Sequence, residues 1–214
     1  WKCWRRRSES GAMRNASPIE PVSLDSLERQ ARRQYDGGHF QAAIDKFDEV
    51  VTRMEGDLGQ DHPRTLDNRN DLARACRAAG RFDRALSLYR QLLDLLVGQL
   101  GPDHPDTLRG RSRIANTYYA AGRYQEAMRL FQDVMAQRTE VLGWDHPDTL
   151  RSRSSLANSY YAVGSYKRAV DMHQETLAAR RRVLGLDDER TQASQARLAE
   201  ARQAAMAGEA GQTT

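Results

Sequence analysis

Apolar and small residues recur along the chain at helical spacing, in runs separated by turns that contain glycine or proline. One run between positions 108 and 118 consists of Leu108, Ile114, Ala115 and Tyr118, and a second between 127 and 141 consists of Ala127, Met128, Phe131, Val134, Met135 and Val141. Steps of three and four residues place such side chains on one face of an α-helix. Because only a few residues separate the two runs, the predicted helices are antiparallel neighbours.

The pattern repeats every 42 residues. Leu-Gly pairs begin at positions 58, 100, 142 and 184. Three further columns keep the same step: Gly38, Gly80, Gly122 and Gly164; Phe40, Phe82, Tyr124 and Tyr166; and Ala43, Ala85, Ala127 and Ala169. Repeats of this length are typical of stacked arrays, in which each unit buries its apolar face against the next unit.

The repeat predicts an all-α array of about four helix pairs and one closing helix. We expect the array to span 23–206, with units over about 23–57, 64–99, 106–141 and 148–183 and a capping helix over 189–206. Residues 1–22 have no period and end in prolines, so they are predicted to be a linker or tail. Residues 207–214 are predicted to be a flexible tail.

The stretch LGPDHPDTL at 100–108 joins two units and carries an Asp-His pair that could be chemical or structural. Proline is favoured at the first position of a helix, and a short polar side chain just before it can cap the free N–H groups. Equivalent residues of stacked units lie roughly 8–10 Å apart. His62, His104 and His146 therefore cannot converge on one metal ion, whose bonds are about 2 Å long. The stretch is interpreted as a helix boundary.

The order of residues within a unit resembles the tetratricopeptide repeat. The fourth unit carries the resemblance in Leu156-Ala157, Tyr160, Gly164, Tyr166 and Ala169. The 42-residue step resembles the longer variant found in kinesin light chains and in bacterial regulators of the actinomycete type. The resemblance implies a right-handed superhelical solenoid whose first helices line a concave face, and a protein–protein interaction scaffold that serves as the sensor or regulatory arm of a larger protein.

Positions on the first helices that avoid the predicted core are the candidate peptide-binding residues. They are Arg32, Tyr35, Asn70, Arg74, Arg77, Arg109, Ser112, Asn116, Tyr119, Arg151, Ser154, Asn158 and Tyr161. Asn can bond a peptide backbone as donor and acceptor, Tyr offers a rigid recognition surface, and Arg binds carboxylates in a bidentate manner. We expect a protein or peptide partner with some acidic residues. A structural alternative is that Asn116 and Asn158 bond across a helix interface while Tyr119 and Tyr161 pack between units.

Composition and charge limit the range of other functions that the chain could have. The net charge is +4, with 33 basic against 29 acidic residues, so an association with nucleic acid through Arg109, Arg113, Arg151 and Arg153 is the alternative function. No catalytic set, phosphate loop or metal motif occurs, so no enzyme activity, cofactor or metal is expected. Two cysteines and no apolar run of membrane length indicate a cytoplasmic protein without a membrane span. Self-association of the open-ended array is a further alternative.

Three single residues could carry chemistry but have simpler explanations. His39 follows Gly38 at a turn. His173 replaces the aromatic residues of a packed column, Tyr89 and Phe131, and is predicted to be a core histidine. Cys76 occupies the column of Tyr118 and Tyr160 and is predicted to be a small buried residue.

Overall fold

The computed structural model describes residues 23–210, and within this range the chain forms nine helices and no strand. Their bounds are α1 Leu24–Asp36, α2 Phe40–Asp57, α3 Pro63–Ala78, α4 Phe82–Leu100, α5 Pro105–Ala120, α6 Tyr124–Leu142, α7 Pro147–Ala162, α8 Tyr166–Leu184 and α9 Glu189–Ala210. The predicted linker 1–22 and the last residues of the predicted tail, 211–214, lie outside the described residues. Residues 207–210 were expected in the tail but continue α9 as helix.

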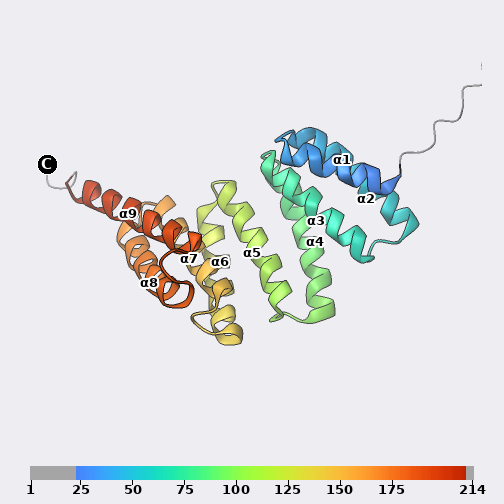
Figure 1. The fold of residues 1–214 in the computed structure, drawn as a ribbon. Helices are drawn as coiled ribbons and strands as arrows, with labels where there is room; N and C mark the ends of the chain where they lie inside the picture. The colour runs from blue at the N-terminus through green and yellow to red at the C-terminus, as the bar shows by residue number, and fades with distance from the viewer. Residues whose placement is uncertain (1–22, 211–214) are drawn as a thin grey trace, which may run out of the picture.

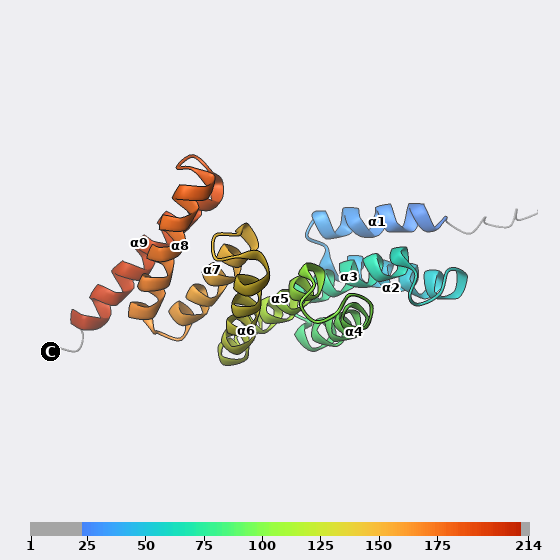
Figure 2. The ribbon, with the colours of Figure 1, turned by 90° about the horizontal axis from the view of Figure 1, so that it is seen from below.

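The helices form an elongated solenoid with α1 and α2 at one end and α8 and α9 at the other (Figure 1). Each helix packs against the helices before and after it in the chain, and α5 also contacts α7. The view from below shows the pairs following one another along a curved path, with α9 beside α8 (Figure 2). The predicted all-α stack of antiparallel pairs is therefore confirmed.

The junctions between units are closed by histidine. His62, His104 and His146 are the N-cap residues of α3, α5 and α7, and each is followed by proline at the first helical position. In α5 the backbone N–H of Asp106 donates to His104 Nδ1 at 3.2 Å. The cap side chain is thus the histidine and not Asp103, although a short polar residue was expected in this role.

The fourth junction keeps the geometry with a different side chain. Asp188 stands where the other junctions have histidine, and its carboxylate accepts the backbone N–H of Arg190 at 2.9 Å. The Arg190 guanidinium also binds this carboxylate, and that hydrogen bond holds the pKa of Asp188 at about 2. The sequence of the fourth junction differs from the other three, but a helix still begins at the corresponding position.

Small and aromatic side chains of the repeat columns make the core. Ala43, Ala85, Ala127 and Ala169 are all completely buried. Phe47, Tyr89 and Phe131 fill the space beside it. Cys76 is completely buried as predicted, and burial raises the pKa of its thiol.

A second column pair joins each second helix to the first helix of the next unit, and its chemistry changes along the array. Asn68 donates to the sulfur of Met54 at 3.5 Å in the first junction. In the third and fourth junctions a buried arginine donates to a serine hydroxyl, from Arg138 to Ser152 and from Arg180 to Ser194. In the second junction the corresponding residue is Gly110, whose α-carbon faces the methyl groups of Leu93 and Leu96. The repeat columns that were read from the sequence did not reveal these buried arginines.

Gly101 and Gly98 make a matched pair for testing the junction. Gly101 has φ 87° and ψ 167°, a conformation that only glycine adopts readily, whereas Gly98 lies inside α4 with open space around it. We expect Gly101→Ala to lower the free energy of unfolding by about 1–3 kcal/mol. The control Gly98→Ala removes a helical glycine and should leave stability unchanged or raise it by up to about 1 kcal/mol. Thermal and urea unfolding followed by circular dichroism measure both. Equal effects of the two substitutions would contradict the assigned role of Gly101.

Candidate functional site

The candidate peptide-binding residues lie on α1, α3, α5 and α7 and avoid the core. Tyr35, Asn70, Arg77, Ser112, Tyr119, Ser154 and Asn158 are half-buried, and Arg32, Arg74, Arg109, Asn116, Arg151 and Tyr161 are exposed. Their spacing along each helix follows the steps of three and four residues from which they were predicted. The structure brings one part of this set together around two neighbouring hollows.

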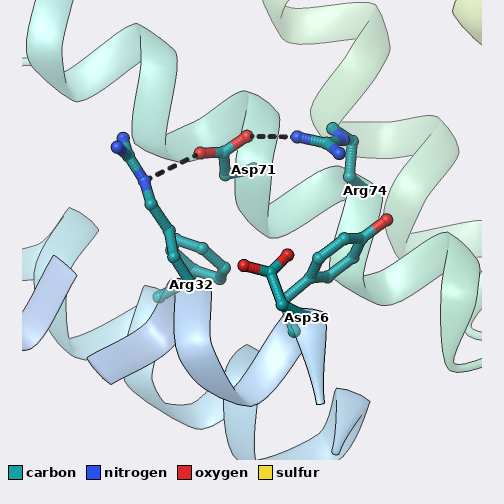
Figure 3. Close-up of a pocket in the computed structure, with 6 residues that line it drawn as sticks. Arg32, Asp36, Asp71 and Arg74 are labelled. Atoms are coloured by element: carbon teal, nitrogen blue, oxygen red, sulfur yellow. Dashed lines mark hydrogen bonds and ion pairs between the residues drawn. The ribbon is translucent and has the colours of Figure 1, made fainter. Parts of the chain in front are cut away.

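The first hollow, of 310 Å³, lies between the first and second units (Figure 3). Asp71 stands between two arginines, with Arg32 at 3.6 Å and Arg74 at 3.0 Å. The Arg74 guanidinium also lies over the ring of Tyr35, 5.0 Å from its centroid. Asp36 and the buried Phe47 complete the lining. The positive charges of this hollow are therefore accompanied by carboxylates.

The second hollow, of 230 Å³, lies between α3, α4 and α5 and shares Arg74 with the first. Its other lining residues are Asn70, Arg77, Tyr89, Arg113 and Asn116. Within the described part of the chain, neither Arg77 nor Arg113 has a carboxylate within ion-pair distance. This hollow therefore contains more positive than negative charge.

Arg113 is the most constrained group of the second hollow. Burial lowers the pKa of its guanidinium, with help from the positive charges of Arg109 and Arg74 and against the effects of Tyr89 and Asp106. The Tyr89 hydroxyl has a raised pKa because it is largely buried, although Arg77 and Arg113 partly oppose the shift. A guanidinium that is partly withdrawn from water without a counter-ion is costly, and an anion would offset that cost.

Arg109 and Arg151 have partners within their own helices. Asp106 lies 2.8 Å from Arg109, and Asp148 lies 2.9 Å from Arg151, each three residues earlier in the chain. The Ser112 hydroxyl donates to the carbonyl oxygen of Leu108 at 3.0 Å. These side chains lie on the predicted face, but part of their bonding capacity is already used.

The tyrosines of the predicted stripe pack within their own units. Tyr119 meets Tyr124 edge to face with ring centroids 5.2 Å apart, and Tyr161 meets Tyr166 in the same way at 5.3 Å. Tyr119 also packs against a core cluster that includes Leu156 and Tyr160 of the next unit, as the alternative expected. Tyr161 is nevertheless 38% exposed, so one side of its ring is open to a partner.

Asn116 and Asn158 make no side-chain hydrogen bond to any described residue. The alternative in which the two amides bond across a helix interface is therefore wrong. Each amide retains a donor and an acceptor, which are the groups that a peptide backbone requires.

Several lining residues were absent from the predicted stripe. Asp71 and Arg113 occupy one 42-residue column, a position after Asn70 and Ser112, and helical spacing alone could have included them. Asp36 directly follows Tyr35 at the end of α1. Phe47 and Tyr89 come from second helices, and only the packing angle between helices shows that they reach the hollows.

The arginines considered for nucleic acid do not form one basic face. Arg153 is 1% exposed; it pairs with Glu175 and lies under the ring of Trp144, 4.0 Å from the centroid. Because Arg109 and Arg151 are paired as well, Arg113 is the member of the set without a carboxylate. The described residues also contain no group of three or more acidic, histidine or cysteine side chains placed to hold a metal.

His173 is a core histidine, as predicted. It is 1% exposed, and its Nδ1 atom has no hydrogen-bond partner among the described residues. Burial lowers its pKa to about 4, with help from the positive charges of Arg197 and Arg180 and against the effect of Glu200. The side chain is therefore neutral near pH 7 and serves packing.

Comparison with known families decides the classification. The family described as tetratricopeptide repeat matches residues 34–96 and 106–182, which is more than half of the chain. The chain belongs to the tetratricopeptide repeat (TPR) family. No helix among the described residues of this TPR array is long and apolar enough to cross a membrane.

Solved TPR structures support the kinesin-light-chain-like variant. The nearly identical TPR-like repeats of a Podosopora anserina protein described as a kinesin light chain are 32% identical, and the match covers 89% of this chain and 90% of that one with a TM-score of 0.71. BtubC from P. vanneervenii is 18% identical over 85% of this chain and 72% of its own, with a TM-score of 0.67, and shows the fold alone. The comparison with curated proteins returned no match.

The TPR core should lose stability in mild acid because of His173. Its folded-state pKa of about 4 lies below the ordinary value of 6.5, so the unfolded chain binds more protons between these values. The contribution is complete above about pH 6.5 and falls as the pH decreases toward 4, by up to about 3 kcal/mol. We expect His173→Phe, which copies Phe131 of the preceding unit, to remove this part of the pH dependence. Unfolding of both proteins at pH 7 and pH 4.5 tests it, and parallel pH profiles would contradict the assignment.

Proposed function

We propose that the TPR array is a scaffold that binds an extended or helical segment of a protein partner along its first helices. One observation carries the proposal. The two hollows share Arg74 and are lined by side chains from successive units, so that a single segment could contact both. TPR proteins generally mediate protein–protein interactions, and the kinesin-light-chain-like arrays serve as scaffolds. A role as the sensor or regulatory arm of a larger protein in the cytoplasm belongs to the same proposal.

The available groups suit recognition of a peptide. Asn116 and Asn158 can each bond one backbone amide, and Tyr161 offers an open ring surface. Arg77 and Arg113 can bind an acidic side chain. These groups bind by hydrogen bonding, stacking and charge, so we infer binding rather than catalysis.

The test uses peptides selected from a displayed random library against the intact chain. We expect Asn116→Ala with Asn158→Ala to weaken binding of the selected peptides at least about tenfold, because two backbone amides lose their partners at about 1 kcal/mol or more each. The thermal unfolding temperature should change little, since neither amide bonds another described residue. Fluorescence anisotropy measures affinity, and circular dichroism measures stability.

The matched control exchanges Arg129 and Asp171 for alanine. These residues are exposed on α6 and α8, away from the first helices, and are themselves one repeat apart. The control should bind peptides as the unchanged chain does. Unchanged binding by the asparagine variant, or equal losses in both variants, would refute the proposed surface.

A further inference from the structure

We propose that the hollow between α3, α4 and α5 is a subsite for a phosphate monoester on a side chain of the bound peptide. The inference rests on the proposed function, because the phosphate is presented by the partner segment. Its ligands would be Arg77 and Arg113, with Arg74, Asn70, Asn116 and the Tyr89 hydroxyl around them.

The hollow carries more positive than negative charge. Arg74 pairs with Asp71 at 3.0 Å, a carboxylate that it shares with Arg32. Arg77 and Arg113 have no described carboxylate within ion-pair distance, which leaves two positive charges. A phosphate monoester carries a charge of about −1.5 to −2 at pH 7 and would neutralise both. One carboxylate of a peptide would neutralise only one of them.

The arginine donors of the hollow come from two different helices. Arg77 comes from α3 and Arg113 from α5, both line the hollow, and the charges of both act on the Tyr89 hydroxyl. A planar carboxylate has two oxygens and matches one guanidinium in a bidentate manner. A phosphate group has three terminal oxygens arranged around phosphorus and can accept from both arginines together. The Asn116 amide and the Tyr89 hydroxyl are further donors at the same place.

The wall of the hollow also contains an unsatisfied hydrogen-bond acceptor. Asn70 Oδ1 is buried and has no hydrogen-bond partner in the part of the chain that the structure describes. An anion cannot satisfy this oxygen, but a backbone N–H beside a phosphorylated residue can do so once the Asn70 side chain turns toward the hollow. The hollow therefore combines donors for a phosphate with an acceptor for the peptide that carries it.

The pair of arginines at positions 77 and 113 does not recur at the equivalent positions of the neighbouring junctions. Position 113 belongs to the column Arg29, Asp71, Arg113, Ser155 and Arg197, and position 77 belongs to the column Tyr35, Arg77, Tyr119 and Tyr161. The first hollow thus contains Asp71 where the second contains Arg113, and Tyr35 where the second contains Arg77. The junction between the third and fourth units has Ser155 and Tyr119 at these positions. Among these junctions the excess positive charge belongs to the second, so it does not follow from the repeat itself.

The experiment measures binding of small probes to the intact chain. The probes are a blocked phosphoserine tripeptide, the same tripeptide with aspartate, and inorganic phosphate, each titrated while the arginine Nε–Hε signals are recorded by NMR. We expect saturable shifts of the Arg77 and Arg113 signals with the phosphoserine peptide and at least tenfold weaker binding of the aspartate peptide. Binding should also weaken below about pH 6, where the phosphate gains its second proton.

Variants assign the site. Arg113→Gln and Arg77→Gln should each weaken the phosphoserine peptide at least tenfold, whereas Arg129→Gln, an exposed arginine of α6, should leave it unchanged. Equal affinity for the aspartate peptide, shifts that do not saturate, or an equal loss with Arg129→Gln would overturn the inference. Binding of inorganic phosphate without binding of the phosphoserine peptide would also overturn it.

The two proposals fail separately. Library peptides that bind through Asn116 and Asn158 while the phosphoserine probe does not bind would retain the scaffold and remove the phosphate subsite. Binding of the phosphoserine probe at Arg77 and Arg113 without any effect of the asparagine variant would retain the subsite and remove the longer groove.

Discussion

At each of three junctions a histidine imidazole accepts a backbone N–H of the next helix, and proline fixes the first helical residue. A glycine with positive φ precedes each histidine, and at Gly101 its carbonyl also accepts the Thr107 hydroxyl at 2.8 Å. Together these groups determine where a second helix ends and how the next first helix departs. Because every junction has the same length, equivalent residues of successive units fall in line.

Because of this alignment, the residues that pack the array and the residues on its surface occupy different columns of the repeat. One column that packs between helices stays alanine throughout, at Ala43, Ala85, Ala127 and Ala169. The columns on the first helices are free to change, so that one column reads Asp71, Arg113 and Ser155 in consecutive units. A constant frame therefore places different charges at equivalent points along the stack.

The sequence predicted what depends on periodicity and left out what depends on side-chain direction. Helix bounds, the buried alanines and the burial of Cys76 and His173 follow from column membership and are observed. The participation of Tyr89 in a hollow was not predicted, because a residue of a second helix reaches the inner side only at the observed packing angle. The bond from Arg138 to Ser152 was missed for a related reason: arginine is usually exposed, and its burial depends on a hydroxyl of another unit.

The uncompensated charge at Arg113 is compatible with a stable array because the stack is modular. In such a chain each unit interacts only with its neighbours, so a local cost at α3, α4 and α5 is not transmitted to the rest of the core. The junction beneath the same hollow is closed by leucine side chains over Gly110, without the buried polar pair that the later junctions contain. The buried Thr107 hydroxyl of α5 also donates to the carbonyl oxygen of Leu96 on α4 at 3.5 Å, so a polar bond as well as apolar contact holds the two helices together there.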